Sequence, residues 1–170
     1  MKTYVCIAIL VLVGVAAKEF AQTSPSAQPC FSLIISTAES RINAGSEMKL
    51  LIKKKNLSKH DIIHSTAVMG GKAFSQSDIT VVIRDSNGNA VKETPLGREM
   101  HGTGPHQPES GSVFNGRTIL KPGDVIQLET KANREYDLTK PGTYTVQAQE
   151  KDSETQRIVL SNVITITVTE

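Results

Sequence analysis

Residues 141–149 read PGTYTVQAQ, and this short stretch decides how the rest of the chain is interpreted. It opens on a proline–glycine pair, which is typical of a turn because proline fixes φ and glycine accepts a positive φ. Apolar and polar side chains then alternate, with Tyr144, Val146 and Ala148 in one set and Thr145, Gln147 and Gln149 in the other. Successive side chains of a strand point to opposite faces, so the pattern predicts a β-strand with one buried face.

The same period of two recurs in four other stretches, residues 31–35, 48–52, 79–83 and 164–168. Turn signals stand between them, as in Asn87-Gly88 and in KPGD at residues 121–124. We expect no amphipathic helix after residue 30, and only residues 135–138 suggest a single helical turn. Seven or eight short strands separated by such turns predict an all-β sandwich of mostly antiparallel strands.

Tyr144 makes the fold prediction more specific. It follows the turn at residues 140–143, begins its strand, and stands two residues before the inward-facing Val146. This placement resembles the tyrosine corner of immunoglobulin-like domains, whose hydroxyl bonds to nearby backbone. The chain has no tryptophan and no cysteine at position 146. The resemblance is therefore to the general immunoglobulin-like architecture and not to antibody-type domains.

The first 21 residues have the layout of a secretory signal peptide. A basic start, Met1-Lys2, precedes an apolar run over residues 4–17 that ends in small residues. The run is shorter than the roughly 20 residues that span a bilayer, although a retained anchor is an alternative. We expect a signal peptide at 1–21, a flexible linker at 22–30 and one sandwich domain at 31–170, in a secreted or periplasmic protein.

The charge and cysteine content of the mature chain limit its partners and its chemistry. Removal of residues 1–21 takes away two lysines and one glutamate, which leaves 17 basic and 16 acidic residues. Such a balance gives no electrostatic reason to expect nucleic acid or an acidic membrane surface as a partner. We also expect no membrane insertion after removal of the signal peptide. Cys30 is then the single cysteine, so no internal disulfide is expected. Pro29 and Ala27 do not fit a lipid-attachment motif, and an unpaired thiol at the start of the first strand is expected.

The segment from Asn89 to Gly111 interrupts the strand rhythm with many glycines and prolines. Loops of this length inside compact domains are commonly functional, and binding residues concentrate on loops. We therefore expect a contact loop, with the candidate binding residues Arg98, Met100, His101 and His106. An inter-strand excursion without a binding role is the alternative.

The sequence carries no recognised catalytic or metal-binding motif. A Gly-x-Ser-x-Gly elbow and a phosphate-binding glycine loop are both missing. His60 and His64 would lie roughly 13 Å apart on one strand, too far to share an ion. We expect no catalytic residues, no metal and no cofactor, and hence no enzyme. The basic run Lys53-Lys54-Lys55 is expected to be a solvated strand edge.

The order of motifs from Leu50 onward resembles a known bacterial family. A lysine-rich strand ends in NLS at residues 56–58, ITVVIRDSNG occupies residues 79–88, and LKPGD, YDL and PGTYTV follow. Over about two-thirds of the chain this is similar to the bacterial intracellular proteinase inhibitor family and to uncharacterised exported proteins. The resemblance implies an immunoglobulin-like sandwich. Our leading expectation is a non-catalytic binding domain for an envelope or extracellular protein. A proteinase inhibitor and a small-ligand or metal carrier are the alternatives.

Overall fold

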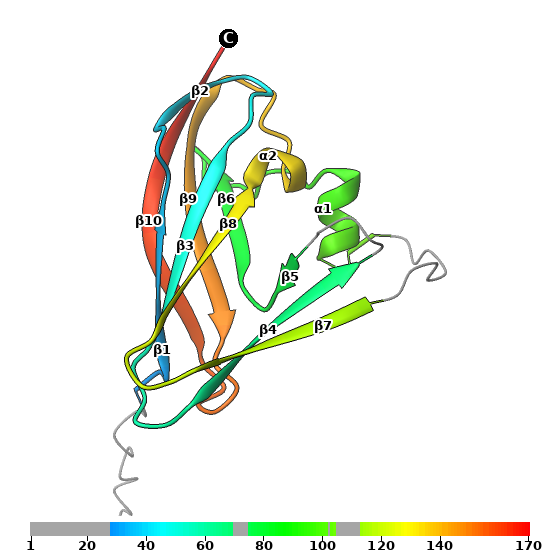
Figure 1. Ribbon diagram of the computed structural model, residues 1–170. Helices are drawn as coiled ribbons and strands as arrows, with labels where there is room; N and C mark the ends of the chain where they lie inside the picture. The colour runs from blue at the N-terminus through cyan, green and yellow to red at the C-terminus, as the bar shows by residue number, and fades with distance from the viewer. Residues whose placement is uncertain (1–27, 70–74, 102, 105–112) are drawn as a thin grey trace, which may run out of the picture.

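The computed structural model describes residues 28–69, 75–101, 103–104 and 113–170, and this part of the chain contains ten strands and two short helices (Figure 1). The elements are β1 (Phe31–Ser36), β2 (Arg41–Asn43), β3 (Lys49–Asn56), β4 (Ile62–Met69), β5 (Ser75–Ser77), β6 (Thr80–Asp85), α1 (Pro95–Met100), β7 (Val113–Leu120), β8 (Val125–Lys131), α2 (Ala132–Glu135), β9 (Gly142–Lys151) and β10 (Ile158–Thr169).

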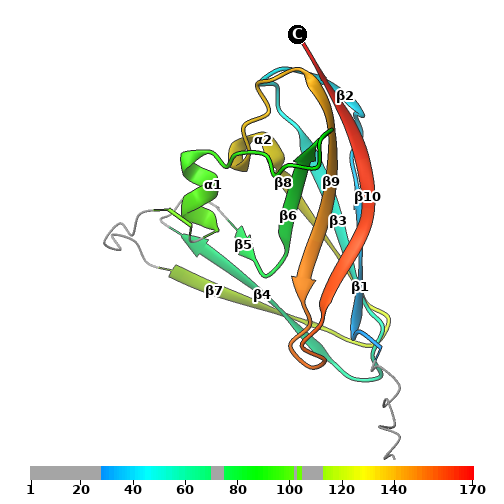
Figure 2. The ribbon, with the colours of Figure 1, turned by 180° about the vertical axis from the view of Figure 1, so that it is seen from behind.

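The strands form three sheets. The order β1-β3-β8 makes one layer of a sandwich, and β2-β10-β9-β6 makes the other. All pairings are antiparallel except that of β2 with β10. The third sheet, β5-β4-β7, leaves the sandwich as a projecting arm, which both views show (Figures 1 and 2). The all-β class predicted from the sequence is confirmed, with more strands than the seven or eight expected and with an unexpected arm.

The core lies between the two sandwich layers and is built by the alternating residues. The inward-facing apolar side chains are almost fully buried: Phe31, Leu33, Ile35, Met48, Leu50, Ile52, Val81, Ile83, Tyr144, Val146, Ala148, Ile166 and Val168. Burial of each large apolar side chain contributes roughly 1.5–3 kcal/mol to folding. The strand predictions made from period-two alternation are therefore confirmed in their inward faces.

Two of the predicted local motifs are present as hydrogen bonds. The Tyr144 hydroxyl donates to the Lys140 carbonyl oxygen at 2.8 Å, which is the contact that a tyrosine corner requires. In the turn at residues 121–124, the Asp124 amide donates to the Lys121 carbonyl at 3.0 Å, and Gly123 has a φ of 85°. Proline and glycine therefore make the turn that the sequence indicated.

Both helices differ from the sequence-based expectation. Helix α1 forms inside the segment that was expected to be a loop, because Thr94 accepts a hydrogen bond from the Gly97 amide and Pro95 occupies the first turn. The predicted helical turn at 135–138 lies instead at 132–135, as α2, and Tyr136 is already extended. A threonine followed by proline was the sequence signal for α1.

The prediction that the basic run at residues 53–55 forms a solvated strand edge is wrong. Strand β3 lies between β1 and β8, so it is no edge. Lys53 and Lys55 are exposed on its outer face, but Lys54 points inward and forms a buried ion pair with Glu150 of β9. Its ammonium also lies 4.1 Å from the centre of the Phe31 ring. Strand alternation turns at least one of three consecutive lysines inward, and here the Glu150 carboxylate pairs with the inward-facing Lys54.

The predicted signal peptide and most of the predicted linker fall at residues 1–27, outside the described residues. In the part of the chain that is described, neither helix has the length and hydrophobicity to cross a membrane.

Candidate binding site

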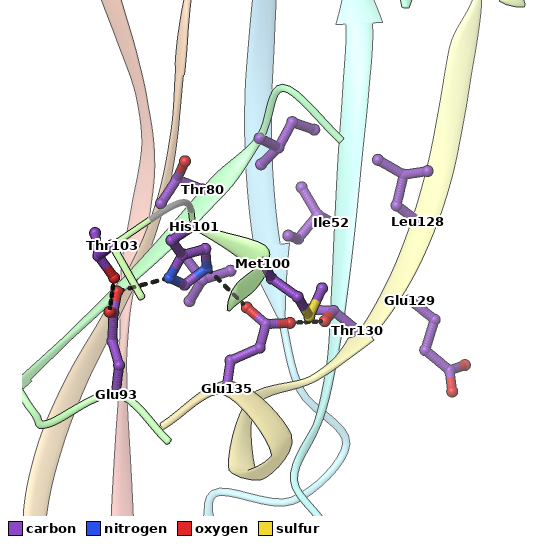
Figure 3. A pocket seen from close by; sticks show the side chains of 12 residues that line it. Ile52, Thr80, Glu93, Met100, His101, Thr103, Leu128, Glu129, Thr130 and Glu135 are labelled. Carbon is purple, nitrogen blue, oxygen red and sulfur yellow. Dashed lines mark hydrogen bonds and ion pairs between the residues drawn. The ribbon is translucent and has the colours of Figure 1, made fainter. Parts of the chain in front are cut away.

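A cavity of about 340 Å³ opens where the two sandwich layers diverge, beside the two helices (Figure 3). One wall comes from β3 and β8, the other from the start of β6, and α1, α2 and their flanking residues close the remaining side. The lining residues are Ile52, Ile79, Thr80, Val81, Glu93, Met100, His101, Thr103, Leu128, Glu129, Thr130 and Glu135. Its volume lies at the small end of the roughly 300–1,000 Å³ of ligand pockets.

The sandwich walls of the cavity are mainly apolar. Ile52 and Val81 belong to the buried core, whereas Leu128 on the edge strand β8 is only half-buried. Strand β8 borders no further strand of its sheet, and its inward face is not fully covered by the opposite layer. The cavity therefore exposes part of the core's apolar surface to a ligand.

The two helices are held together by backbone contacts. The Thr94 amide donates to the Glu135 carbonyl at 2.8 Å, and the Asp137 amide donates to the Lys92 carbonyl at 2.9 Å. Gly97 approaches so closely that a β-carbon there would lie 2.0 Å from the Glu135 carbonyl oxygen. Glycine at position 97 is thus a steric requirement for placing the end of α1 over α2.

This packing places the His101 imidazole between two glutamates (Figure 3). Nδ1 lies 2.6 Å from Glu93 Oε1, and Nε2 lies 3.3 Å from Glu135 Oε2. The imidazole also packs against the Tyr136 ring at a centroid distance of 5.7 Å. A neutral ring donates to one glutamate only, whereas an imidazolium donates to both.

Two threonines fix the carboxylates. Thr103 Oγ1 donates to Glu93 Oε2 at 2.6 Å, and Thr130 Oγ1 donates to Glu135 Oε1 at 2.7 Å. The hydrogen bond from Thr103, with a further one from His101, lowers the pKa of Glu93 below its ordinary value. Glu93 is therefore ionised at neutral pH.

Tyr136 lies beside the His101 imidazole and connects this region to β6. Its hydroxyl donates a hydrogen bond to the Val81 carbonyl in β6. Burial, with the nearby Glu135 charge, raises the pKa of Tyr136, so the phenol stays protonated and keeps that bond. The helical side of the cavity is in this way tied to the second sandwich layer.

The cavity carries more negative than positive groups. Its lining includes three glutamates, at positions 93, 129 and 135, against one histidine. Glu129 is exposed and lies 3.8 Å from Lys49, which is not part of the lining. The Glu129 side chain points away from the other two glutamates (Figure 3), so Glu93 and Glu135 supply the carboxylates that can attract a cationic ligand.

Two of the four residues predicted for binding line this cavity, Met100 and His101. Arg98 does not line it; its guanidinium donates to the Glu93 carbonyl at 3.0 Å and so positions that residue. His106 lies outside the described residues. Sequence reasoning missed Glu93 and Glu135, because their convergence depends on the packing of α1 on α2.

The described residues contain one group of metal-ligating side chains with converging donor atoms, and it lies apart from the cavity. It consists of Cys30, His60 and Glu154. The sequence predicted no metal site and suggested that His60 and His64 share one strand, but His60 lies in the connection from β3 to β4. His64 is instead buried within β4.

No protein-family model matches the chain, and no curated protein matches it. Among solved structures it is similar to the CARDB domain of the PF1109 protein from Pyrococcus furiosus in complex with di-metal ions. The identity is 14%, the TM-score 0.45, and the match covers 83% of this chain and 94% of that one. It is also similar to a beta-glucosidase from Listeria innocua in complex with glucose, at 13% identity and a TM-score of 0.41, covering 82% of this chain and 16% of that one.

These likenesses concern the fold alone. The matched region is a small part of the glucosidase. None of the comparisons supports the resemblance to the bacterial intracellular proteinase inhibitor family.

Proposed function

We propose that this chain is an exported, non-catalytic β-sandwich domain that binds a partner protein by accepting a lysine or arginine side chain in the cavity beside α1 and α2. The observation that carries the proposal is a cavity with apolar side chains on its sandwich walls and the carboxylates of Glu93 and Glu135 on its helical side. The layout of residues 1–21 supports export.

A basic side chain matches both kinds of surface in the cavity. Its methylene stem can pack on Ile52, Val81 and Leu128, while its charged head lies beside Glu93 and Glu135. A charge-assisted hydrogen bond contributes about 1.5–3 kcal/mol, more than a neutral one. The volume suits a single side chain with a short stretch of peptide.

The arrangement of His101 supports binding in preference to catalysis. General-base catalysis needs a ring nitrogen that faces the nucleophile. Here both nitrogens face glutamates, and the nearby Thr103 hydroxyl donates to Glu93. The imidazole therefore serves as a bridge that fixes two carboxylates.

Selection of displayed random peptides on the immobilised chain tests the proposal. We expect enriched peptides to share a lysine or arginine flanked by apolar residues. Replacing that arginine by the neutral citrulline should weaken binding about 10–100-fold, the equivalent of one charge-assisted hydrogen bond.

Glu93→Gln and Glu135→Gln should weaken binding of the same peptides to a similar degree. Glu39→Gln, at an exposed glutamate outside the cavity lining, is the matched control and should leave binding unchanged. Enrichment of acidic peptides, or equal binding by all three variants, would contradict the assignment of this cavity.

A further inference from the structure

Three segments that are distant in the sequence meet at the end of the sandwich where β1 begins (Figure 1). Cys30 directly precedes β1, His60 lies in the connection from β3 to β4, and Glu154 lies in the connection from β9 to β10. The donor atoms of these three side chains all lie within 4.8 Å of one another. The cluster is separate from the cavity beside α1 and α2.

The backbone of Cys30 holds the connection that carries His60. The Cys30 carbonyl accepts hydrogen bonds from the Leu57 amide at 2.8 Å and the Ser58 amide at 3.1 Å. The His60 carbonyl in turn accepts from Asn56 Nδ2 at 2.8 Å and from Ser58 Oγ at 2.7 Å. The positions of Cys30 and His60 are thus fixed by a shared network.

Asp152 positions Glu154 beside Cys30. This carboxylate is 1% exposed, and its Oδ2 accepts from the Cys30 amide at 2.8 Å. Its Oδ1 accepts from the Glu154 amide at 3.0 Å, and Thr155 Oγ1 donates to Oδ2 at 2.8 Å. One buried side chain therefore links the cysteine to the turn that presents the glutamate.

We propose that Cys30, His60 and Glu154 form a binding site for a thiophilic divalent metal ion, of which zinc is the representative. A sulfur, an imidazole nitrogen and a carboxylate oxygen are the donor types that zinc takes in proteins. Sulfur disfavours magnesium and calcium, which prefer oxygen donors. Three protein ligands leave a fourth position for water.

The spacing requires only small side-chain shifts. Zinc–ligand bonds of about 2.0–2.3 Å place tetrahedral donors about 3.3–3.7 Å apart. His60 Nε2 and Glu154 Oε1 are 2.8 Å apart and must separate slightly to admit an ion. Both side chains are about half exposed, at 56% and 45%, so they can move and the ion can enter from solvent.

A cobalt titration of the purified chain tests the site, because thiolate-bound tetrahedral Co²⁺ gives a charge-transfer band and intense visible bands. We expect one Co²⁺ per chain, with displacement by one equivalent of Zn²⁺ and a higher thermal midpoint in the presence of Zn²⁺. Cys30→Ser should abolish the charge-transfer band.

His60→Gln and Glu154→Gln alter exposed positions and are expected to fold. Mutation of a residue that only hydrogen-bonds to a metal ligand changes metal affinity about 10–100-fold, so loss of a direct ligand should weaken Zn²⁺ binding at least about tenfold. Glu39→Gln is the control and should bind as the unaltered chain does. Absence of the charge-transfer band at one equivalent of Co²⁺ would overturn the proposal. So would unchanged affinity in both the His60 and the Glu154 variants.

Discussion

Replacement of Lys54 by methionine tests the buried ion pair that the sequence analysis missed. The Lys54 and Glu150 side chains are only 2% and 5% exposed, so methionine would leave the Glu150 carboxylate buried without its partner. Removal of one partner of a buried pair costs about 3–5 kcal/mol, a large share of the ~5–15 kcal/mol that stabilise a typical domain. With a urea m-value of about 2 kcal/mol/M, this cost should lower the urea concentration at the unfolding midpoint by roughly 1.5–2.5 M.

The loss of stability caused by Lys54→Met should increase as the pH rises. Burial raises the pKa of Glu150 above its ordinary value of 4.5, and loss of the lysine charge raises it further. A group whose pKa is raised by folding contributes stability below its unfolded pKa and loses that contribution as pH rises through the folded pKa. The destabilisation by Lys54→Met should therefore be small near pH 4.5 and grow toward pH 7.

Urea unfolding followed by circular dichroism at both pH values measures the effect. Lys53→Met, at the exposed neighbour on the same strand, is the control and should change stability by no more than about 0.5 kcal/mol. The double variant Lys54→Met/Glu150→Leu should recover most of the loss, because an apolar pair can replace a buried ion pair. A cost below about 1 kcal/mol at both pH values for Lys54→Met would refute the reasoning.

Three further predictions follow from single contacts. Gly97→Ala should cost about 1–3 kcal/mol by overpacking against the Glu135 carbonyl, and an unchanged melting temperature would contradict that close approach. Burial, followed by the Lys54 charge, lowers the pKa of His64. Wild-type stability should therefore fall as pH drops below about 6.5, and His64→Leu should lose this dependence in pH-resolved unfolding curves. Tyr144→Phe should cost about 0.5–1.5 kcal/mol by thermal unfolding, and no cost would mean that the tyrosine-corner bond contributes nothing.

The strands were predictable because their residues obey a local rule. In the strand of Tyr144 and Val146, period-two alternation identifies the buried face without knowledge of the partner strand. Turn chemistry is equally local, as Gly123 shows with its positive φ. These strands and turns, which depend on neighbouring residues alone, were therefore predicted, and the strands had the correct inward faces.

The buried Lys54–Glu150 ion pair and both candidate sites depend on contacts between residues that are distant in the sequence. Local sequence patterns do not reveal such contacts. Lys54 and Glu150 are 96 positions apart, and no spacing rule connects them. Cys30, His60 and Glu154 converge only because two connections and the segment before β1 lie at the same end of the sandwich. Helix α1 was locally encoded by Thr94 and Pro95 and was overlooked because strand periodicity dominates the rest of the chain.

The most direct test of the proposed function follows backbone amide chemical shifts while N-acetyl-arginine amide is added to the isotope-labelled chain. We predict saturable shifts at Thr80, Glu93, His101 and Glu135, much smaller shifts with the citrulline analogue, and loss of the response in Glu93→Gln/Glu135→Gln. Equal responses to the charged and neutral compounds, or shifts confined to residues outside the cavity, would contradict the account.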